Sequence, residues 1–249
     1  MKIAVRMSFI GMGFYGTQKQ KSFRTVQNVF EKALKTLYEQ EIKSTICSRL
    51  DRGVNAKDFL ISFIAPDKRV TLEHLKYYLS RALGIEFFIK SVRIVPDSFS
   101  ARYSCDYKVY VYTIQNGIER NPLLNPTSYA PMKRMDYSKI KEALPLFEGK
   151  HDFRQFATPE SPDENTVLSI DETKVTFSKG LIKIYFKGQS FLRYQVRFMV
   201  GCLIRYATSK ITLEDINTLL SGKTLNWQKL KADPQGLTLL KIHYPSLDK

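Results

Sequence analysis

Hydrophobic and polar residues alternate over several short stretches in the first hundred residues, and two longer stretches show a helical repeat. Alternation is typical of strands with one buried face, and it predicts strands at residues 3–9, 42–47, 59–64 and 87–95. Apolar positions spaced by three and four residues predict two helices, capped by Thr25 and Thr71, with Gly84 ending the second. The resulting order, β-α-β-β-α-β, is that of a ferredoxin-like fold.

The second half of the chain repeats this order loosely. The pattern predicts strands at 108–115, 167–177, 181–187 and 237–243, and helices at 137–147 and 191–207. A shorter helix is expected after Thr212, with Asp215 completing a capping box and Gly222 ending it. The sequence thus predicts an α+β chain of two halves, residues 1–105 and 106–249. Their sheets would meet edge to edge or face to face, with a cleft between them.

The charge of the chain indicates the class of partner. It has 39 basic and 24 acidic residues, a net charge of +15, which favours nucleic acid over the alternative of a merely soluble basic protein. No apolar stretch approaches the ~20 residues of a membrane span. The three cysteines and three histidines are too scattered for a disulfide framework or a metal site. We therefore expect a cytoplasmic protein without a metal.

Three glycines after the first strand match a dinucleotide-binding pattern. Gly11, Gly13 and Gly16 spell G-x-G-x-x-G, but in a dinucleotide site the helix opens on the glycines, whereas this helix is expected to begin near Thr25. We interpret the segment instead as a flexible loop that carries polar and basic side chains to phosphate groups. Those side chains are Gln18, Lys19, Gln20, Lys21 and Arg24.

A carboxylate lies between two arginines in the loop 49–55. Asp51 has Arg49 and Arg52 on either side, and nearby guanidinium groups keep a carboxylate ionised. A carboxylate repels phosphate, so it would not help a surface that only binds RNA. The pattern therefore suggests a nucleophile or base. The alternative is a turn aspartate that bonds its own backbone before Gly53.

Two further patterns each have a functional and a structural interpretation. Tyr110 and Tyr112 share one face of a strand with Ile114, which suits either a base-stacking platform or a core face. Arg193 and Arg197 are four residues apart, which places them on one face of the expected helix. They are either two solvated side chains or guanidinium groups held toward the cleft.

Together these segments resemble the tRNA pseudouridine synthase A family over nearly the whole chain. The resemblance rests on an ordered set of short motifs: Phe14–Gln20, Arg49-x-Asp51-x-Gly53-Val54, Phe99–Arg102, Lys108-x-Tyr110-x-Tyr112, Gly149–Phe153, Phe191–Arg197 and Gly236-Leu237. It implies two ferredoxin-like halves in an extended mixed, mostly antiparallel sheet, with helices on one side and a central basic cleft. It also implies a homodimer that binds tRNA and, without a cofactor, isomerises uridine to pseudouridine in the anticodon stem-loop, around positions 38–40.

The resemblance also assigns roles to individual residues. Asp51 matches the catalytic aspartate, Tyr110 the tyrosine that contacts the target base, and Arg197 the arginine paired with the aspartate. The expected substrate-binding residues are Arg49, Arg102, Lys19, Gln18, Arg24, Lys108, Arg193 and Asn55, besides Tyr110. The chain departs from the family at several positions, with Thr17 for a usual Trp, Leu50 for Thr, Arg52 for a small residue and Asn55 for His. The alternative function is a non-catalytic tRNA-binding or folding module on the same scaffold.

Overall fold

The chain forms two compact units. A computed structural model describes residues 1–67, 69–117, 119–158, 165–225 and 229–248. The first unit comprises residues 1–106 together with 239–249, and the second comprises residues 107–238. The sequence analysis placed the last strand with the second half, whereas most of it groups here with the first unit. The division into the two predicted halves, residues 1–105 and 106–249, stays a prediction.

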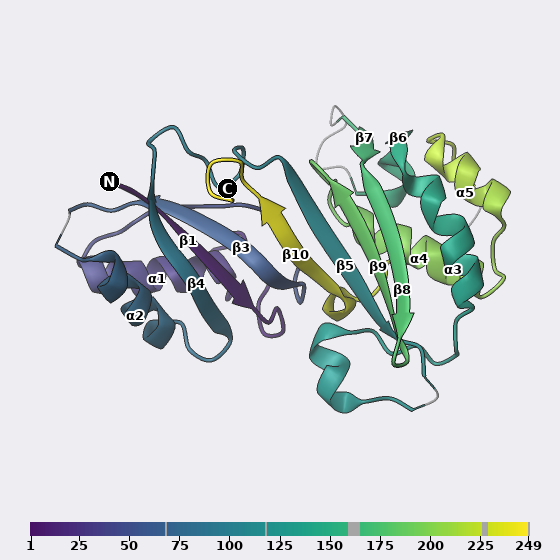
Figure 1. Cartoon of the computed structure of the whole chain (residues 1–249), viewed down its shortest axis with the longest axis horizontal. Helices are drawn as coiled ribbons and strands as arrows, with labels where there is room; N and C mark the ends of the chain where they lie inside the picture. The colour runs from purple at the N-terminus through teal and green to yellow at the C-terminus, as the bar shows by residue number, and fades with distance from the viewer. Residues whose placement is uncertain (68, 118, 159–164, 226–228, 249) are drawn as a thin grey trace. The chain divides into compact units, whose positions relative to one another are not determined.

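The first unit has the predicted order of strands and helices (Figure 1). β1 lies between β3 and β4 and is antiparallel to both, while β2 and β10 are further neighbours of β3. Its elements are β1 (Lys2–Phe9), α1 (Val26–Tyr38), β2 (Ser44–Ile46), β3 (Asn55–Ile64), α2 (Leu72–Ala82), β4 (Phe87–Val95) and β10 (Leu237–His243).

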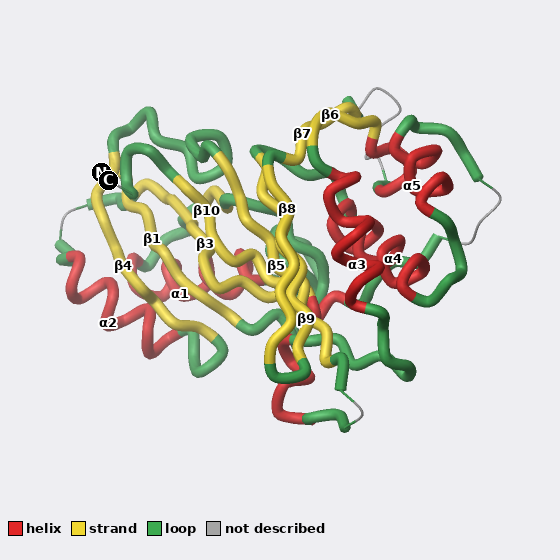
Figure 2. The backbone as a smooth tube through the Cα atoms, turned by 45° about the vertical axis from the view of Figure 1, so that its right-hand side comes forward, coloured by secondary structure: helices red, strands yellow, loops and turns green. Residues whose placement is uncertain are grey.

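Capping and packing place both helices of this unit on one side of its strands. The side chains of Thr25 and Thr71 accept hydrogen bonds from the first turns of α1 and α2, as predicted. The Tyr78 hydroxyl donates to the carbonyl of Ala33 at 3.1 Å, which fixes the two helices beside each other (Figure 2). Register puts the apolar residues of β1 and β3 on a common face, where Ile3 lies opposite Phe63. That face is the buried core of the unit.

An ion-pair cluster ties the end of the chain to the first unit. Arg6 on β1 contacts the carboxylates of Asp58 and Asp248 and donates to the Ile242 carbonyl at 2.7 Å. Burial disfavours the charged form of Asp248, but its hydrogen bonds with Arg6 and with the Tyr244 amide outweigh this and lower the pKa of its carboxyl. These bonds explain why residues 239–249 belong with the first unit.

The second unit is built around three antiparallel strands, with β9 between β5 and β8. A separate pair, β6 and β7, is also antiparallel, and α3, α4 and α5 lie together on one side of β5, β9 and β8 (Figure 1). Its elements are β5 (Tyr107–Gln115), η1 (Pro122–Thr127), α3 (Tyr137–Ala143), η2 (Leu144–Phe147), β6 (Gly149–Asp152), η3 (Phe153–Phe156), β7 (Val167–Ile170), β8 (Glu172–Ser178), β9 (Leu181–Gly188), α4 (Gln195–Ala207), α5 (Leu213–Leu220) and η4 (Pro234–Gly236).

The predicted α+β fold with mostly antiparallel strands and one-sided helices is confirmed, but several predicted elements differ. The strand expected over 59–64 begins at Asn55, and the strand expected over 42–47 covers only Ser44–Ile46. The strand expected over 167–177 is two strands, because at Asp171 the chain stops pairing with β6 and begins to pair with β9. The helix expected over 137–147 ends at Ala143 and continues as a 3₁₀ helix. The helix expected from Phe191 begins only at Gln195, because the backbone of Tyr194 is left-handed (φ 65°).

Within the described residues, no helix combines the length and the hydrophobicity that crossing a membrane would require. The basic cleft stays a prediction.

Candidate active site

A buried threonine holds the loop that carries Asp51. The Thr17 hydroxyl donates to the Ser48 carbonyl at 2.9 Å and accepts from the Leu50 amide at 2.8 Å. The Thr17 amide donates to the Leu50 carbonyl at 3.1 Å. Thr17 is 1 % exposed, so these bonds form away from water, where an unmade hydrogen bond is costly. Thr17 therefore fixes the backbone one residue before Asp51.

The glycines of the G-x-G-x-x-G segment let two backbones come close together. A Cβ atom on Gly11 would lie 2.2 Å from the Val54 carbonyl oxygen, and one on Gly16 would lie 2.6 Å from the Leu50 carbonyl oxygen. The helix begins at Val26, well after the glycines, as the sequence predicted. The segment thus contacts the Asp51 loop from both ends, and these contacts explain Gly11 and Gly16 without a dinucleotide.

The Asp51 loop closes as a tight turn beside an aromatic stack. The Val54 amide donates to the Asp51 carbonyl at 3.1 Å, and Gly53 has a φ of 79° that favours glycine. The guanidinium carbon of Arg52 lies 4.2 Å from the ring centroid of Tyr15. Tyr15 is stacked on Phe23 with ring centroids 4.6 Å apart. Asp51 itself is half-buried, on a loop whose position is fixed by its neighbours.

The predicted RNA-binding residues of the first unit fall into two groups. Lys19 and Arg24 already have acidic partners, because Lys19 Nζ lies 2.7 Å from Glu31 Oε2 and Arg24 Nη1 donates to Glu86 Oε1 at 3.1 Å. The hydrogen bond to Glu31 raises the pKa of Lys19, so the pair stays charged. Lys19 and Arg24 are nevertheless exposed, as are Gln18, Arg49 and Arg102, whereas Asn55 is buried. The loop expected to be flexible is held by several internal hydrogen bonds, including one from the Lys19 amide to Gln27.

Asn55 lies at the buried start of β3. It is 2 % exposed, and its side-chain oxygen accepts a hydrogen bond from the Gly11 amide at 2.8 Å. A buried amide at this place joins the glycine segment to the Asp51 loop. Its predicted role in substrate binding stays a prediction.

The two tyrosines of β5 lie on its buried face. Tyr110 is 6 % exposed, and its ring meets the edge of Phe191 with centroids 5.0 Å apart. Tyr112 is fully buried and donates its hydroxyl to the Asp233 carbonyl at 2.9 Å, and burial raises the pKa of that hydroxyl well above its usual range. Tyr112 is therefore a core residue. Lys108, on the same strand, donates to the Gln189 carbonyl at 3.3 Å.

Arg197 is buried in the first turn of α4, and Arg193 precedes that helix. The Nε atom of Arg197 donates to the Ala232 carbonyl at 2.8 Å, and the Ala232 amide donates back to the Arg197 carbonyl at 3.1 Å. The expectation that both arginines lie on one helix face is wrong, because α4 begins at Gln195. Both guanidinium groups nevertheless lie beside the Tyr194 ring.

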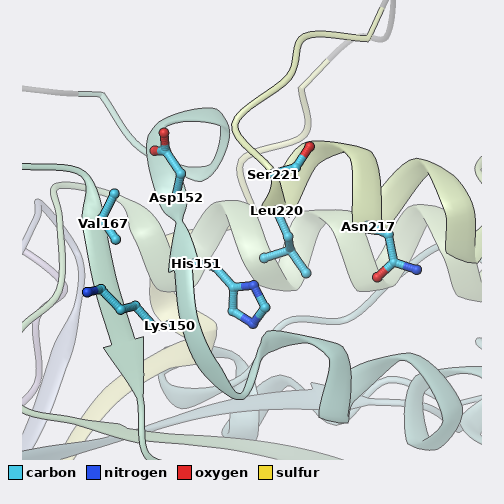
Figure 3. Close-up of a pocket in the computed structure, with 7 residues that line it drawn as sticks. All are labelled: Lys150, His151, Asp152, Val167, Asn217, Leu220 and Ser221. Atoms are coloured by element: carbon cyan, nitrogen blue, oxygen red, sulfur yellow. The ribbon is translucent and has the colours of Figure 1, made fainter.

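A shallow pocket of about 530 Å³ in the second unit lies at the Gly149–Phe153 motif (Figure 3). His151 and Leu220 line it, while the Asp152 carboxylate points away from the imidazole. That carboxylate accepts a hydrogen bond from Thr166 at 2.7 Å and pairs with Arg154 at 2.7 Å. The Asp152 carboxylate therefore binds neighbouring residues of the fold. The three predicted catalytic residues, Asp51, Tyr110 and Arg197, do not line this pocket.

Comparisons with known proteins identify the family. The chain is 36 % identical over 238 residues to tRNA pseudouridine synthase A of Aquifex aeolicus, covering 96 % of this chain and 97 % of that protein. It is 36 % identical to the protein of the same name from Dictyoglomus thermophilum (96 % and 98 % covered) and 33 % identical to that of Staphylococcus epidermidis (98 % and 91 %). A family model described as tRNA pseudouridine synthase matches residues 143–245. The chain belongs to the tRNA pseudouridine synthase A family, a family of isomerases.

A solved structure also shows a distant likeness. It is a chain of the archaeal box H/ACA sRNP Nop10-Cbf5 complex, at a TM-score of 0.36 and 10 % identity. The match covers 82 % of this chain and 43 % of that chain, so the present chain spans less than half of its length.

Proposed function

We propose that the protein converts uridine to pseudouridine in the anticodon stem-loop of tRNA, around positions 38–40, with Asp51 as the catalytic aspartate. The observation that carries this is Asp51 itself, the family's aspartate, on a loop fixed by Thr17, Gly11 and Gly16. Family membership supports the reaction, and the net charge of +15 supports a polyanionic substrate.

The reaction breaks one bond of the nucleoside and makes another. The C1′–N1 bond breaks, the uracil turns, a C1′–C5 bond forms, N1 takes up a proton and C5 loses one. Asp51 acts either by attack at C1′ or by addition to the base. Arg197 is buried, and its Nε atom donates to the Ala232 carbonyl. It matches the family's arginine that is paired with the aspartate, and it would keep the Asp51 carboxylate charged and oriented. Such a fixed cation is electrostatic preorganisation.

A uridine inside a stem has to leave its helix before it reacts. Flipping costs a few kcal/mol, which protein contacts with the base offset. We infer that Tyr110 supplies one such contact by stacking. Its ring is covered by Phe191, so Phe191 moves when the base enters. The proposal also includes a homodimer in the cytoplasm that needs no cofactor.

Mapping of the product tests the proposal. Unmodified tRNA transcripts are incubated with the protein, treated with a carbodiimide that marks pseudouridine, and read by primer extension. We expect stops at one or more of positions 38–40. Full binding of the transcripts with no new stop would overturn the proposal and favour a tRNA-binding module.

Stacking by Tyr110 predicts unequal effects of two substitutions on tRNA affinity. Tyr110→Phe keeps the ring and should bind nearly as tightly as the native protein. Tyr110→Ala should lose ~1–3 kcal/mol, as expected for one stacked base. Filter binding of tRNA measures both, with thermal melting to confirm that each variant is folded. Equal affinity of all three proteins would show that Tyr110 serves only the core.

A further inference from the structure

Three cations from two separate segments surround one aromatic ring in the second unit. Lys231 Nζ lies 4.0 Å from the ring centroid of Tyr194, and the guanidinium carbons of Arg193 and Arg197 lie 4.9 and 5.5 Å from it. Arg193 also donates to the Tyr194 hydroxyl at 3.1 Å. All three distances fall within the ~6 Å range of a cation–π contact. One ring thus gathers three positive charges in a small space.

Arg193 and Lys231 supply the positive charge that is available to a ligand here, because Arg197 is the arginine proposed to pair with Asp51. The first turn of α4 contains no acidic residue, and its N-cap, Tyr194, gives no side-chain cap. Arg193 and Lys231 form no ion pair with any part of the chain that the structure describes. The start of a helix is itself partly positive. Each of these features raises the local potential, so an anion bound here would be stabilised by all of them.

The backbone beside these cations is held in place. The reciprocal hydrogen bonds between Arg197 and Ala232 fix the backbone next to Lys231 against α4. Arg193 and Lys231 are exposed, whereas Arg197 is buried. The two exposed cations can therefore meet a ligand in solvent, at a site that adjoins the proposed catalytic arginine.

We propose that Arg193, Tyr194 and Lys231 form a binding site for a phosphodiester group of the RNA substrate. The ring orients the two cations, and the phosphate lies between them at the start of α4. This inference rests on the proposed function, because it assumes that the RNA bound beside Arg197 is the substrate. Neither Tyr194 nor Lys231 was singled out by the sequence analysis.

Salt dependence of tRNA binding tests the site. Each phosphate contact releases counterions, so its loss lowers the slope of log affinity against log salt by about 1. We expect this change for Lys231→Gln, with about three- to tenfold weaker binding near 0.1 M salt. Tyr194→Phe keeps the ring and should bind nearly as well as the native protein. Lys139→Gln is the matched control, since Lys139 Nζ lies 5.5 Å from the Tyr206 ring, whose hydroxyl donates to Glu142.

The outcomes separate this inference from the proposed function. A slope for Lys231→Gln equal to that of the native protein or of Lys139→Gln would overturn the site, even if the native protein forms pseudouridine. A reduced slope in a protein that forms no pseudouridine would support the site while the proposed function fails. Inorganic phosphate at constant ionic strength competes for a phosphodiester site, so a high concentration should reduce the difference between Lys231→Gln and the native protein. A difference that phosphate leaves unchanged would count against the site.

Discussion

Asp51→Asn should abolish pseudouridine formation and leave tRNA binding intact. The substitution keeps the size of the side chain but removes the negative charge that the reaction needs. Loss of a catalytic nucleophile lowers turnover by about 10³-fold or more. Because a carboxylate repels phosphate, binding of tRNA should be unchanged or slightly tighter. Single-turnover product formation and filter binding on the same tRNA measure the two effects separately.

Asp97→Asn is a suitable control for this experiment. Asp97 is an exposed residue of the same unit, and its substitution changes the net charge by the same amount. It should react at the native rate. Product formed by Asp51→Asn at a rate near that of Asp97→Asn would show that Asp51 is only a turn residue.

Gly16→Ala should damage both stability and turnover far more than Gly13→Ala. Both glycines have positive φ, 89° and 91°, where an alanine costs about 1–2 kcal/mol. A Cβ on Gly16 would also lie 2.6 Å from the Leu50 carbonyl oxygen, whereas one on Gly13 meets only side-chain ends at 3.6 Å. We therefore expect about 1 kcal/mol of lost unfolding free energy for Gly13→Ala and about 3 kcal/mol or more for Gly16→Ala.

The comparison isolates the contact with the Asp51 loop. Urea unfolding gives the free energies, and product formation under conditions where both variants are folded gives the turnover. The displaced Leu50 backbone adjoins Asp51, so Gly16→Ala should be slow even when folded, while Gly13→Ala should be close to native. Equal losses in the two variants would mean that this backbone contact matters neither for the fold nor for the loop.

Local sequence signals explain which elements could be predicted. β4 and β10 have the predicted bounds, 87–95 and 237–243, because each apolar stretch is flanked on both sides by Gly or Pro. β6 was missed because Gly149–Asp152 has no alternating apolar pattern and becomes a strand by pairing with β7. α4 begins late because the backbone of Tyr194 is left-handed, and just before it the Thr158 amide donates to the Arg193 carbonyl at 3.2 Å. A contact between residues so far apart in the sequence leaves no periodic signal.

The candidate site was predictable in part for the same reason. Asp51 stood out because its neighbours are arginines, a signal contained within a few residues. Thr17 gave no such signal: its role comes from bonds to Ser48 and Leu50 across more than thirty positions. Tyr194 and Lys231 are brought together by the hydrogen bonds between Arg197 and Ala232. That Asp51 acts together with Tyr110 and Arg197 stays a prediction.

Release of tritium from tRNA labelled at uridine C5 is the most direct test of the central claim, because only a reaction at that carbon frees the label. The account predicts that the native protein releases one tritium for each uridine it modifies, over repeated turnovers and without an added cofactor. Tight binding of the labelled tRNA with no release above background would contradict it.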